Sequence, residues 1–551
     1  SEAIVLTPQR VPWIWFLCPV IAGYFAANSF SQSDSLPFLF GALTCILVAL
    51  LAEGWNRRPL GLWQLFFLSA ALCLAIAHYL DVEGHRKSVP TWFALPPREL
   101  VLEVEITRLF NQRKDSETTS GLGLVRKVAS VRHDLVGKRL YFRLDLSDSV
   151  PAPLRGDVVR AVGVLYPVNG NKDNSFVNHL LAKGIYYEFR RGQFLETVES
   201  AGIFRHFCQD ANHNFEKYLR AGAELKDETA AGISVAMLLG KKAAIPSEHK
   251  ERFILAGAMH LFAISGLHVA IVAGLIILLL RLMPGPRWME TILSLTLLFL
   301  YVQITGGAPS AQRAFIMIAF WKASNIAGRR GGALPALVAS AILVLAVDPR
   351  QLWDKGFQLS YSVVASIILF GGPLGERLQS TLRPWPFLSK EELSLPRKLI
   401  VQVVHWFGGA LGISAAATFA STPLTVEAFG VFSPGGILLN VFLVLLAIGV
   451  LWLAVFSLPF GAFGFDFLHE IAWFIIRIMD FLVNFFVGIP GLFFRAETVV
   501  PWASGVTVFA YLGVCMALAR RLPTLPAFAY LAAPACPAFF IAFGANLSLG
   551  N

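Results

Sequence analysis

Two histidines and a serine interrupt an apolar stretch near the middle of the chain. The stretch begins His260-Leu-Phe-Ala-Ile-Ser-Gly-Leu-His-Val-Ala270 and stays apolar to about Leu280. Ionisable groups are costly at membrane depth, and they usually face a bundle interior, a water-filled path or a substrate. His260 and His268 lie about two helical turns apart and could share one face. The segment therefore predicts a membrane span beside which something polar passes or binds.

Ser265 and Gly266 could break this helix, and a broken helix at membrane depth exposes backbone groups that can coordinate a substrate. Three other interpretations stay open. The histidines could only hydrogen-bond to neighbouring helices. They could ligate a metal, although the sequence offers no third ligand. Ser265 and His268 could also serve a membrane-embedded hydrolase. We predict neither a metal site nor a cofactor.

Composition points to a chain that crosses a membrane many times. Of 551 residues, 56% are hydrophobic and only 15% are charged, whereas soluble domains carry about 25% charged residues. The formal net charge is +10. Cytoplasmic loop arginines that follow the positive-inside rule explain such a charge, and so does affinity for an anionic substrate such as nucleic acid. None of the six cysteines forms a CxxC pair, so neither a zinc site nor a disulfide framework is indicated.

Apolar runs of about 20 residues predict the spans. Arg57 and Arg58 place the link between the second and third runs in the cytoplasm, and later loop arginines fall on the same side when every run crosses. The predicted spans are Val11–Phe30, Leu36–Ala52, Leu60–Leu80, His260–Met283, Trp288–Ile304, Ala311–Ala327, Leu334–Val347, Phe357–Gly371, Leu399–Ser421, Gly436–Pro459, Ile471–Phe494, Trp502–Leu518 and Pro526–Phe543.

The region from Asp81 to Asp227 differs in kind, because its charges are dense and mixed in sign. Short runs with period-two alternation predict half-buried strands, and about five of them suit a small β-barrel of the OB type. A helix is expected at Ile203–Leu219. The strand runs are Leu100–Ile106, Gly123–Val131, Lys138–Leu144, Asp157–Val164 and Gly184–Phe189. Three domains are predicted: helices over 1–80, the OB-like domain over 81–227 and a channel domain over 228–551.

Several phrases of the sequence agree with one family in order and spacing. The chain resembles the competence domain of the ComEC family of DNA-uptake channels, and the outer domain resembles that family's OB-like module. The phrases are Met237–Lys242, Phe253–Val269, Ile304–Ala314, Asp348–Ser360, Thr422–Phe432 ahead of Asn440, and, in the outer domain, Arg155–Val158 and Asn174–Ile185.

The resemblance implies a channel that carries single-stranded DNA across the bacterial cytoplasmic membrane during natural transformation. Many family members also have a C-terminal metallo-β-lactamase-like domain. We expect that domain to be missing here, since no HxHxDH cluster occurs, and we expect no enzymatic activity. With no nucleotide-binding motif, transport energy must come from a partner or a gradient. The implied partners are single-stranded DNA, the lipid bilayer, and DNA-receptor and cytoplasmic motor proteins.

Other polar residues in the predicted spans are candidates for the DNA path. Arg313 could pair with a phosphate, or it could snorkel to lipid headgroups. Lys322 lies deeper in the same span, so both could line one path. Gln358 and Ser360 could add neutral lining, although helix packing explains them equally well.

Basic and aromatic residues alternate in the outer domain, as in proteins that bind single strands. Barrel aromatics are often core residues instead, so this interpretation has a structural alternative. The candidates are Arg126, Lys127, Arg132, Lys138, Arg139, Tyr141, Arg143, Tyr187, Arg190 and Arg191.

The sequence thus predicts a polytopic α-helical membrane protein with an inserted extracytoplasmic all-β OB-like domain, acting as a conduit for single-stranded DNA. A small-solute or lipid transporter built on the same helices is the main alternative, and the membrane-embedded hydrolase is the second.

Overall fold

The computed structural model divides the chain into two compact units. One unit comprises Pro19–Asn214 with Asp348–Trp353, and the other comprises Ser1–Cys18, Phe215–Val347 and Asp354–Asn551. The three predicted domains stay a prediction. The structure describes residues 12–29, 34–54, 62–87, 98–110, 118–129, 135–146, 153–168, 177, 180–181, 184–221, 227–241, 245–262, 264–328, 332–388, 393–461, 467–500, 502–519 and 530–549.

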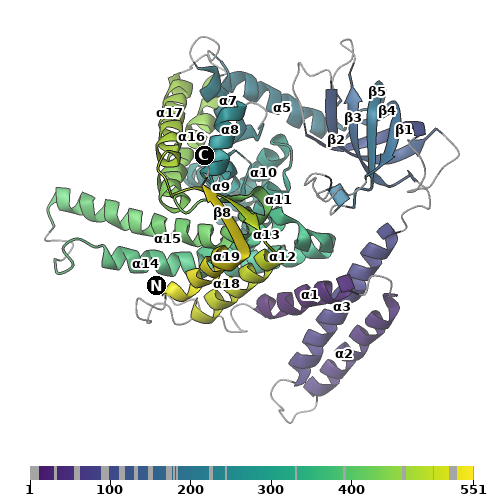
Figure 1. The fold of residues 1–551 in the computed structure, drawn as a ribbon, viewed down its shortest axis with the longest axis horizontal. Coiled ribbons are helices and arrows are strands. Elements are labelled where there is room, and N and C mark those ends of the chain that lie inside the picture. The colour runs from purple at the N-terminus through teal and green to yellow at the C-terminus, as the bar shows by residue number, and fades with distance from the viewer. Residues whose placement is uncertain are drawn as a thin grey trace. The chain divides into compact units, whose positions relative to one another are not determined.

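Three apolar helices open the chain, close to the ranges predicted for the first three spans: α1 Pro12–Ser29, α2 Leu36–Gly54 and α3 Leu62–Lys87 (Figure 1). The hydroxyl of Tyr79 donates to Asn28 Oδ1 at 3.0 Å between α3 and α1. Trp353, from the 3₁₀ segment η5 Pro349–Trp353, packs on Tyr79 and on Phe25, with ring centroids 5.2 and 5.7 Å away. Aromatic packing therefore ties η5 to this helical group.

A closed five-stranded barrel follows, in the order β1-β2-β3-β5-β4. Neighbouring strands are antiparallel except for the parallel pair β3 and β5. Alternation sets the faces, because Leu140, Phe142 and Leu144 of β3 are buried while the residues between them point outward. Every predicted strand run overlaps one strand, which confirms the period-two pattern. The strands are β1 Arg98–Leu109, β2 Thr118–Val128, β3 Arg139–Asp145, β4 Val158–Pro167 and β5 Tyr187–Glu199.

The phrase Arg155-Gly-Asp-Val158 builds the turn before β4. Gly156 has φ +100°, a conformation that favours glycine, and a Cβ there would also displace the Arg205 side chain. The carboxylate of Asp157 is buried and accepts the amide N–H groups of Leu154 and Ala201, at 2.6 and 2.7 Å. The phrase therefore has a structural role that joins the barrel to the segment after β5.

The remaining elements are mainly helices. Over all described residues, including α3, four helical segments are long and apolar enough to cross a membrane: Gln64–Val82, Lys355–Thr381, Leu395–Phe429 and Gly436–Leu458. The helices of the second part of the chain are α5 Ile203–Leu219, α7 Glu228–Leu239, α8 Ser247–Leu255, η4 Met259–Leu261, α9 Gly266–Arg281, α10 Arg287–Ile304, α11 Pro309–Ile326, α12 Ala333–Val347, α13 Lys355–Ser366, η6 Ile367–Gly371, α14 Gly372–Thr381, α15 Leu395–Phe429, α16 Gly436–Gly461, α17 Phe467–Val487, α18 Ala503–Ala519 and α19 Ala532–Gly544. The predicted span Phe357–Gly371 is part of a longer helical path through the π-helical turn η6 into α14.

Glycines allow α14 and α15 to pack closely. A Cβ on Gly412 would lie 2.5 Å from the backbone nitrogen of Gly375, and one on Gly375 would lie 3.2 Å from the Cα of Gly409. Small residues that bring backbones together are typical of helix pairs in membranes. This interface explains why α14 runs alongside α15 although it is only ten residues long.

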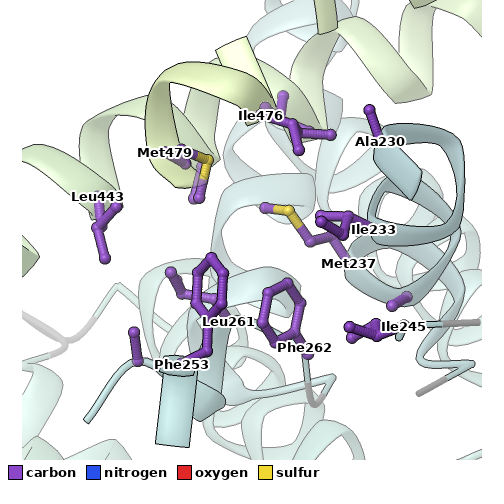
Figure 2. Close-up of a cluster of buried hydrophobic side chains, with 14 of the residues drawn as sticks. Ala230, Ile233, Met237, Ile245, Phe253, Leu261, Phe262, Leu443, Ile476 and Met479 are labelled. Carbon is purple, nitrogen blue, oxygen red and sulfur yellow. The ribbon is translucent and has the colours of Figure 1, made fainter. Parts of the chain in front are cut away.

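A buried apolar cluster holds α7, α8, η4, α16 and α17 together (Figure 2). Met237 of α7, Phe253 of α8 and Phe262 after η4 contribute to it, with Leu443 of α16 and Met479 of α17. α7 is buried over Ala230–Leu239, which explains why its sequence shows no polar face.

The polar residues that interrupt α17 have partners on neighbouring segments. Arg477 Nε donates to Asp227 Oδ2 at 2.8 Å, and Asp480 Oδ1 lies 2.9 Å from His249 Nδ1 of α8. The predicted span over Ile471–Phe494 ends earlier than expected, at Val487, and the chain continues into a strand.

A small antiparallel sheet joins the ends of several helices. Its strands are β6 Val431–Phe432, β7 Phe494–Thr498 and β8 Ala545–Leu549, with β7 in the middle. β6 follows α15, β7 lies between α17 and α18, and β8 follows α19. These helix ends must therefore lie on one side of any membrane that the helices cross.

Candidate functional site

The candidate segment is broken as the Ser265-Gly266 pair predicts. The 3₁₀ turn η4 ends at Leu261, and α9 begins at Gly266 after Ser265, whose backbone is extended at φ −101° and ψ 170°. The predicted span His260–Met283 is corrected by this break, because its first turn belongs to η4 and its helix starts six residues later.

Both ring nitrogens of His268 have protein partners. Nε2 lies 3.1 Å from the carbonyl oxygen of Leu261, so it carries the ring proton and donates. Nδ1 then accepts from the Ser265 hydroxyl at 2.9 Å and faces the Ser265 amide at 3.4 Å. Ser265 and His268 together form a capping box at the start of α9. The imidazole is 1% exposed, so in this arrangement it is occupied with holding the break.

Other side chains satisfy carbonyl groups around the break. The Ser310 hydroxyl, in the first turn of α11, donates to the Ile264 carbonyl oxygen. The Ser433 hydroxyl donates to the Leu255 carbonyl oxygen at 2.7 Å. Non-helical backbone at membrane depth needs such partners, because lipid offers none. The segment from α8 to α9 is thus fixed by polar contacts that sequence reasoning did not identify.

His260 is separate from this network in its contacts. Its Nδ1 lies 3.1 Å from the Gly257 carbonyl oxygen, and its side chain is exposed. Over the part of the chain that the structure describes, no group of three or more His, Cys, Asp or Glu side chains could hold a metal. The structure also places no carboxylate on His268 among the contacts of its two ring nitrogens, which a Ser-His hydrolase would use to orient its base.

Arg313 is 4% exposed and bridges two helices. Its Nη2 donates to the Gly356 carbonyl oxygen of α13 at 2.9 Å, while Asp354 caps α13 by accepting from the Phe357 amide at 3.1 Å. Its Nε is buried and has no hydrogen-bond partner. Arg313 therefore lies in packed protein and not at a lipid headgroup.

Lys322 lies in a buried ion pair. Its Nζ donates to Glu290 Oε1 at 2.6 Å, and Arg281 Nε lies 3.9 Å from the same oxygen. The Lys322 side chain is 5% exposed and the Glu290 side chain 17%. This cluster joins the last turn of α9, the first turn of α10 and the last part of α11. The positive charge of Lys322 is therefore balanced by the Glu290 carboxylate within the protein.

The neutral candidates Gln358 and Ser360 lie on α13 and are partly buried. Sequence reasoning missed Glu427, which lies near the end of α15 and accepts from Lys355 Nζ at 2.7 Å and from the Ser504 hydroxyl. One carboxylate therefore joins α13, α15 and α18. An acidic residue close to the end of an apolar helix is the signal that could have identified it.

Barrel candidates fall into three groups. Tyr187 is 3% exposed and belongs to the barrel core with Phe142 and Phe189, so it does not present a ring to a ligand. Arg126 and Arg190 are exposed but paired, with Glu105 at 2.8 Å and Glu188 at 2.7 Å. The others that are described are exposed or partly exposed on the barrel surface: Lys127, Lys138, Arg139, Tyr141, Arg143 and Arg191; Arg132 lies outside the described residues.

Three of these residues share one face of the barrel with two residues that the sequence analysis did not select. Arg139, Tyr141 and Arg143 point outward from β3. Tyr141 packs against Phe110 at 6.2 Å between ring centroids, and the guanidinium of Arg108 lies 5.3 Å from the Phe110 ring centroid. Phe110 is 40% exposed. We call Arg108, Phe110, Arg139, Tyr141 and Arg143 the β1–β3 face.

A family model and one named relative point to the same family. A family model described as "Competence protein" matches residues 237–548, more than half of the chain. The chain is similar to "ComE operon protein 3" of Bacillus subtilis, 38% identical over 25% of this chain and 18% of that protein. It is also similar to "Uncharacterized protein YcaI" of Escherichia coli, 29% identical over 40% and 32%, and to an "Uncharacterized protein" of Aquifex aeolicus, 32% identical over 26% and 35%.

These alignments span about a third or less of each relative's own length. No solved structure matches the chain. The family match begins at Met237 in α7 and extends into β8, so it includes the broken helix, the buried ion pairs and the small sheet. The chain therefore belongs to the ComEC family of competence proteins.

Proposed function

We propose that this protein takes up DNA during natural transformation by carrying a single strand across the cytoplasmic membrane. The observation that carries the proposal is the β1–β3 face together with membership of a competence family. Proteins that bind single strands combine a basic surface with aromatic rings on which bases stack. Tyr141 and Phe110 supply the rings, and Arg108, Arg139 and Arg143 supply the charge.

The strand arrangement supports the same proposal. We infer that the barrel is of the OB type, since its five strands close in the order β1-β2-β3-β5-β4 with β3 and β5 parallel. OB-folds bind oligonucleotides on the face of strands 2 and 3. Arg139, Tyr141 and Arg143 lie on the third strand, opposite Leu124, Leu122 and Ser120 of the second.

The membrane part would provide the conduit between packed but irregular helices. The break before α9 places non-helical backbone among the apolar helices, and such backbone is tolerated where it is buried or lines a wet cavity. The π-helical turn η6 adds a second irregularity in the helical path. In this proposal three polar residues hold the helices in place and do not contact the strand: His268, Arg313 and Lys322. Each is already hydrogen-bonded to another residue of the protein.

From the threading of the loop arginines we infer that the small sheet β6-β7-β8 and the barrel lie outside the cytoplasm. DNA-receptor proteins outside and motor proteins inside are the proposed partners, because the sequence offers no nucleotide motif to supply energy.

Binding of a fluorescent single strand to the full-length protein in detergent tests the proposal. A salt titration should give weak binding that falls as salt rises, with a slope of about −0.7 for each phosphate contact. Replacing Tyr141 by Ala, and Arg139 with Arg143 by Gln, should each weaken binding, whereas Arg160→Gln should not. Arg160 is the matched control because it is an exposed barrel arginine already paired with Glu103 and Glu196.

Lack of binding at low salt would favour a small-solute or lipid transporter. Equal losses in Arg160→Gln and in the β1–β3 face variants would show a nonspecific charge effect and would remove the face from the proposal.

A further inference from the structure

A cavity of about 390 Å³ opens beside α8, within the part of the chain that matches the competence family. Its lining comes from α8, from the end of α15 with β6, and from β7. Ligand-binding pockets have volumes of about 300–1,000 Å³, so this cavity is large enough for a small organic group.

The lining has a charged mouth and an apolar wall. Lys250 and Arg495 bring two positive charges, and Arg495 Nη2 lies 3.2 Å from Glu251 Oε1. The Lys250 ammonium has no carboxylate partner among the described residues, so the mouth keeps a net positive charge. Ile254 lies on the wall, and Phe429 is 62% exposed at the end of α15.

Fixed backbone surrounds the cavity. Gly430 adopts φ +65° as the cap of α15, and its carbonyl oxygen accepts from the Ala496 amide at 2.9 Å. On the other side, Ser433 holds the Leu255 carbonyl at the end of α8. The wall is therefore formed by contacts between segments far apart in sequence. The cavity is present without any conformational change.

We propose that this cavity binds one nucleotide unit of a single DNA strand, with the phosphate at Lys250 and Arg495 and the base against Phe429 and Ile254. Arginine and lysine are the usual partners of phosphate, and an exposed aromatic ring stacks on any base. The proposal rests on the proposed function, and it adds a second contact with the strand, in the helical part of the chain. An anionic lipid headgroup has the same phosphate but would not need an aromatic ring, so the lipid becomes an outcome of the test.

The experiment measures binding of a labelled short oligothymidylate to the full-length protein in nanodiscs of zwitterionic lipid. The background carries Arg139→Gln, Tyr141→Ala and Arg143→Gln, so that the β1–β3 face no longer contributes. On this background, Lys250→Gln should reduce the salt slope by about 0.7, and Phe429→Ala should weaken binding at every salt concentration. Lys217→Gln, at an exposed lysine of α5, is the matched control and should change neither.

Ile254→Trp fills the cavity while keeping its charges, and it should abolish the remaining binding. Unchanged binding in Lys250→Gln, Phe429→Ala and Ile254→Trp would overturn the cavity proposal and leave the proposed function standing if the β1–β3 face binds. Loss of oligothymidylate binding in phosphatidylglycerol nanodiscs, to the same extent with and without Phe429→Ala, would also overturn the cavity proposal, because the occupant would then be lipid. Absence of binding in the unmodified protein would instead refute the proposed function itself.

Discussion

The Ser265 hydroxyl and the His268 imidazole lie 2.9 Å apart, and the two residues form a capping box that starts a helix in the middle of an apolar region. This pair has the residue types of a catalytic dyad, but its geometry is used to hold backbone. The other nitrogen of His268 binds the Leu261 carbonyl oxygen, so a single imidazole joins both ends of the break.

Replacing His268 by Ala should therefore destabilise the protein. The buried Leu261 carbonyl would lose its donor and Ser265 its cap partner, at a cost of about 1–3 kcal/mol. Thermal unfolding in detergent measures the loss. His268→Gln, which keeps a donor, should lose less, and Ala270→Ser, at an exposed position on α9, is the control. Normal thermal stability of His268→Ala with failed DNA uptake would contradict the structural role and point to direct contact with the strand.

Lys322 and Glu290 should behave as a coupled pair. Removing one partner leaves a buried charge and costs about 3–5 kcal/mol, whereas replacing both by apolar residues is much less harmful. Lys322→Met should thus lower the unfolding temperature more than Lys322→Met with Glu290→Met. The double-mutant cycle gives the coupling energy. Additive losses would show that the pair does not interact, and Lys322 would again be available to line a path.

Much of the fold could be predicted from the sequence. Period-two alternation located the five barrel strands, and apolar runs located most helices to within a few residues, because burial on one or both faces sets these patterns. The small sheet β6-β7-β8 could not be predicted, since its short strands pair segments that lie far apart in the sequence. The roles of the candidate site residues were harder to predict. The sequence shows that Lys322 is charged, but it does not show that Glu290 forms an ion pair with it.

The directions of the barrel side chains were also difficult to predict from the sequence. Tyr141 and Tyr187 look alike in sequence, each next to basic residues, yet one points outward and the other into the core. A shift of one residue along a strand reverses the face. Phe110 and Arg108 were missed because they lie just after β1 and near its end, and the pairing of both β1 and β3 with β2 brings them beside Tyr141.

Stability should fall in acid through Asp227. Burial acts to raise the pKa of this carboxyl, but the Ala230 amide and the Arg477 guanidinium outweigh it, so the pKa lies below its ordinary value of 3.8. A lowered folded-state pKa gives stability that is present above the ordinary value and is lost as pH falls through the folded pKa. Thermal unfolding between about pH 5 and pH 2 should show this loss. Asp227→Asn should reduce the pH dependence, and Glu199→Gln, at the exposed end of β5, should not. An unchanged pH profile in Asp227→Asn would rule out this carboxyl as the cause.

Gly184 should tolerate no side chain. It has φ +69°, and a Cβ there would collide with the guanidinium of Arg350, so two phrases of the sequence meet at this point. Gly184→Ala should cost about 1–3 kcal/mol through backbone strain, and the flexible end of the Arg350 side chain would have to shift at little further cost. Limited proteolysis and thermal unfolding check this. Gly202→Ala, where no atom lies within 4 Å of the added Cβ, is the control. Arg350→Ala should rescue Gly184→Ala only slightly, and a full rescue would show that the collision, not the backbone conformation, sets the cost.

Cysteine labelling tests the sidedness that the small sheet imposes. Glu497 of β7 and Asn546 of β8 pair in one sheet, so single cysteines at these positions, in a cysteine-free background, must react from the same side. By the threading of loop arginines that side is outside, and a membrane-impermeant maleimide should label both in intact cells. Ser380→Cys, exposed near the end of α14, should react only after the membrane is opened. Labelling of all three in intact cells would contradict the threading, because the helix ends joined by the sheet and the α14–α15 connection would then share a side.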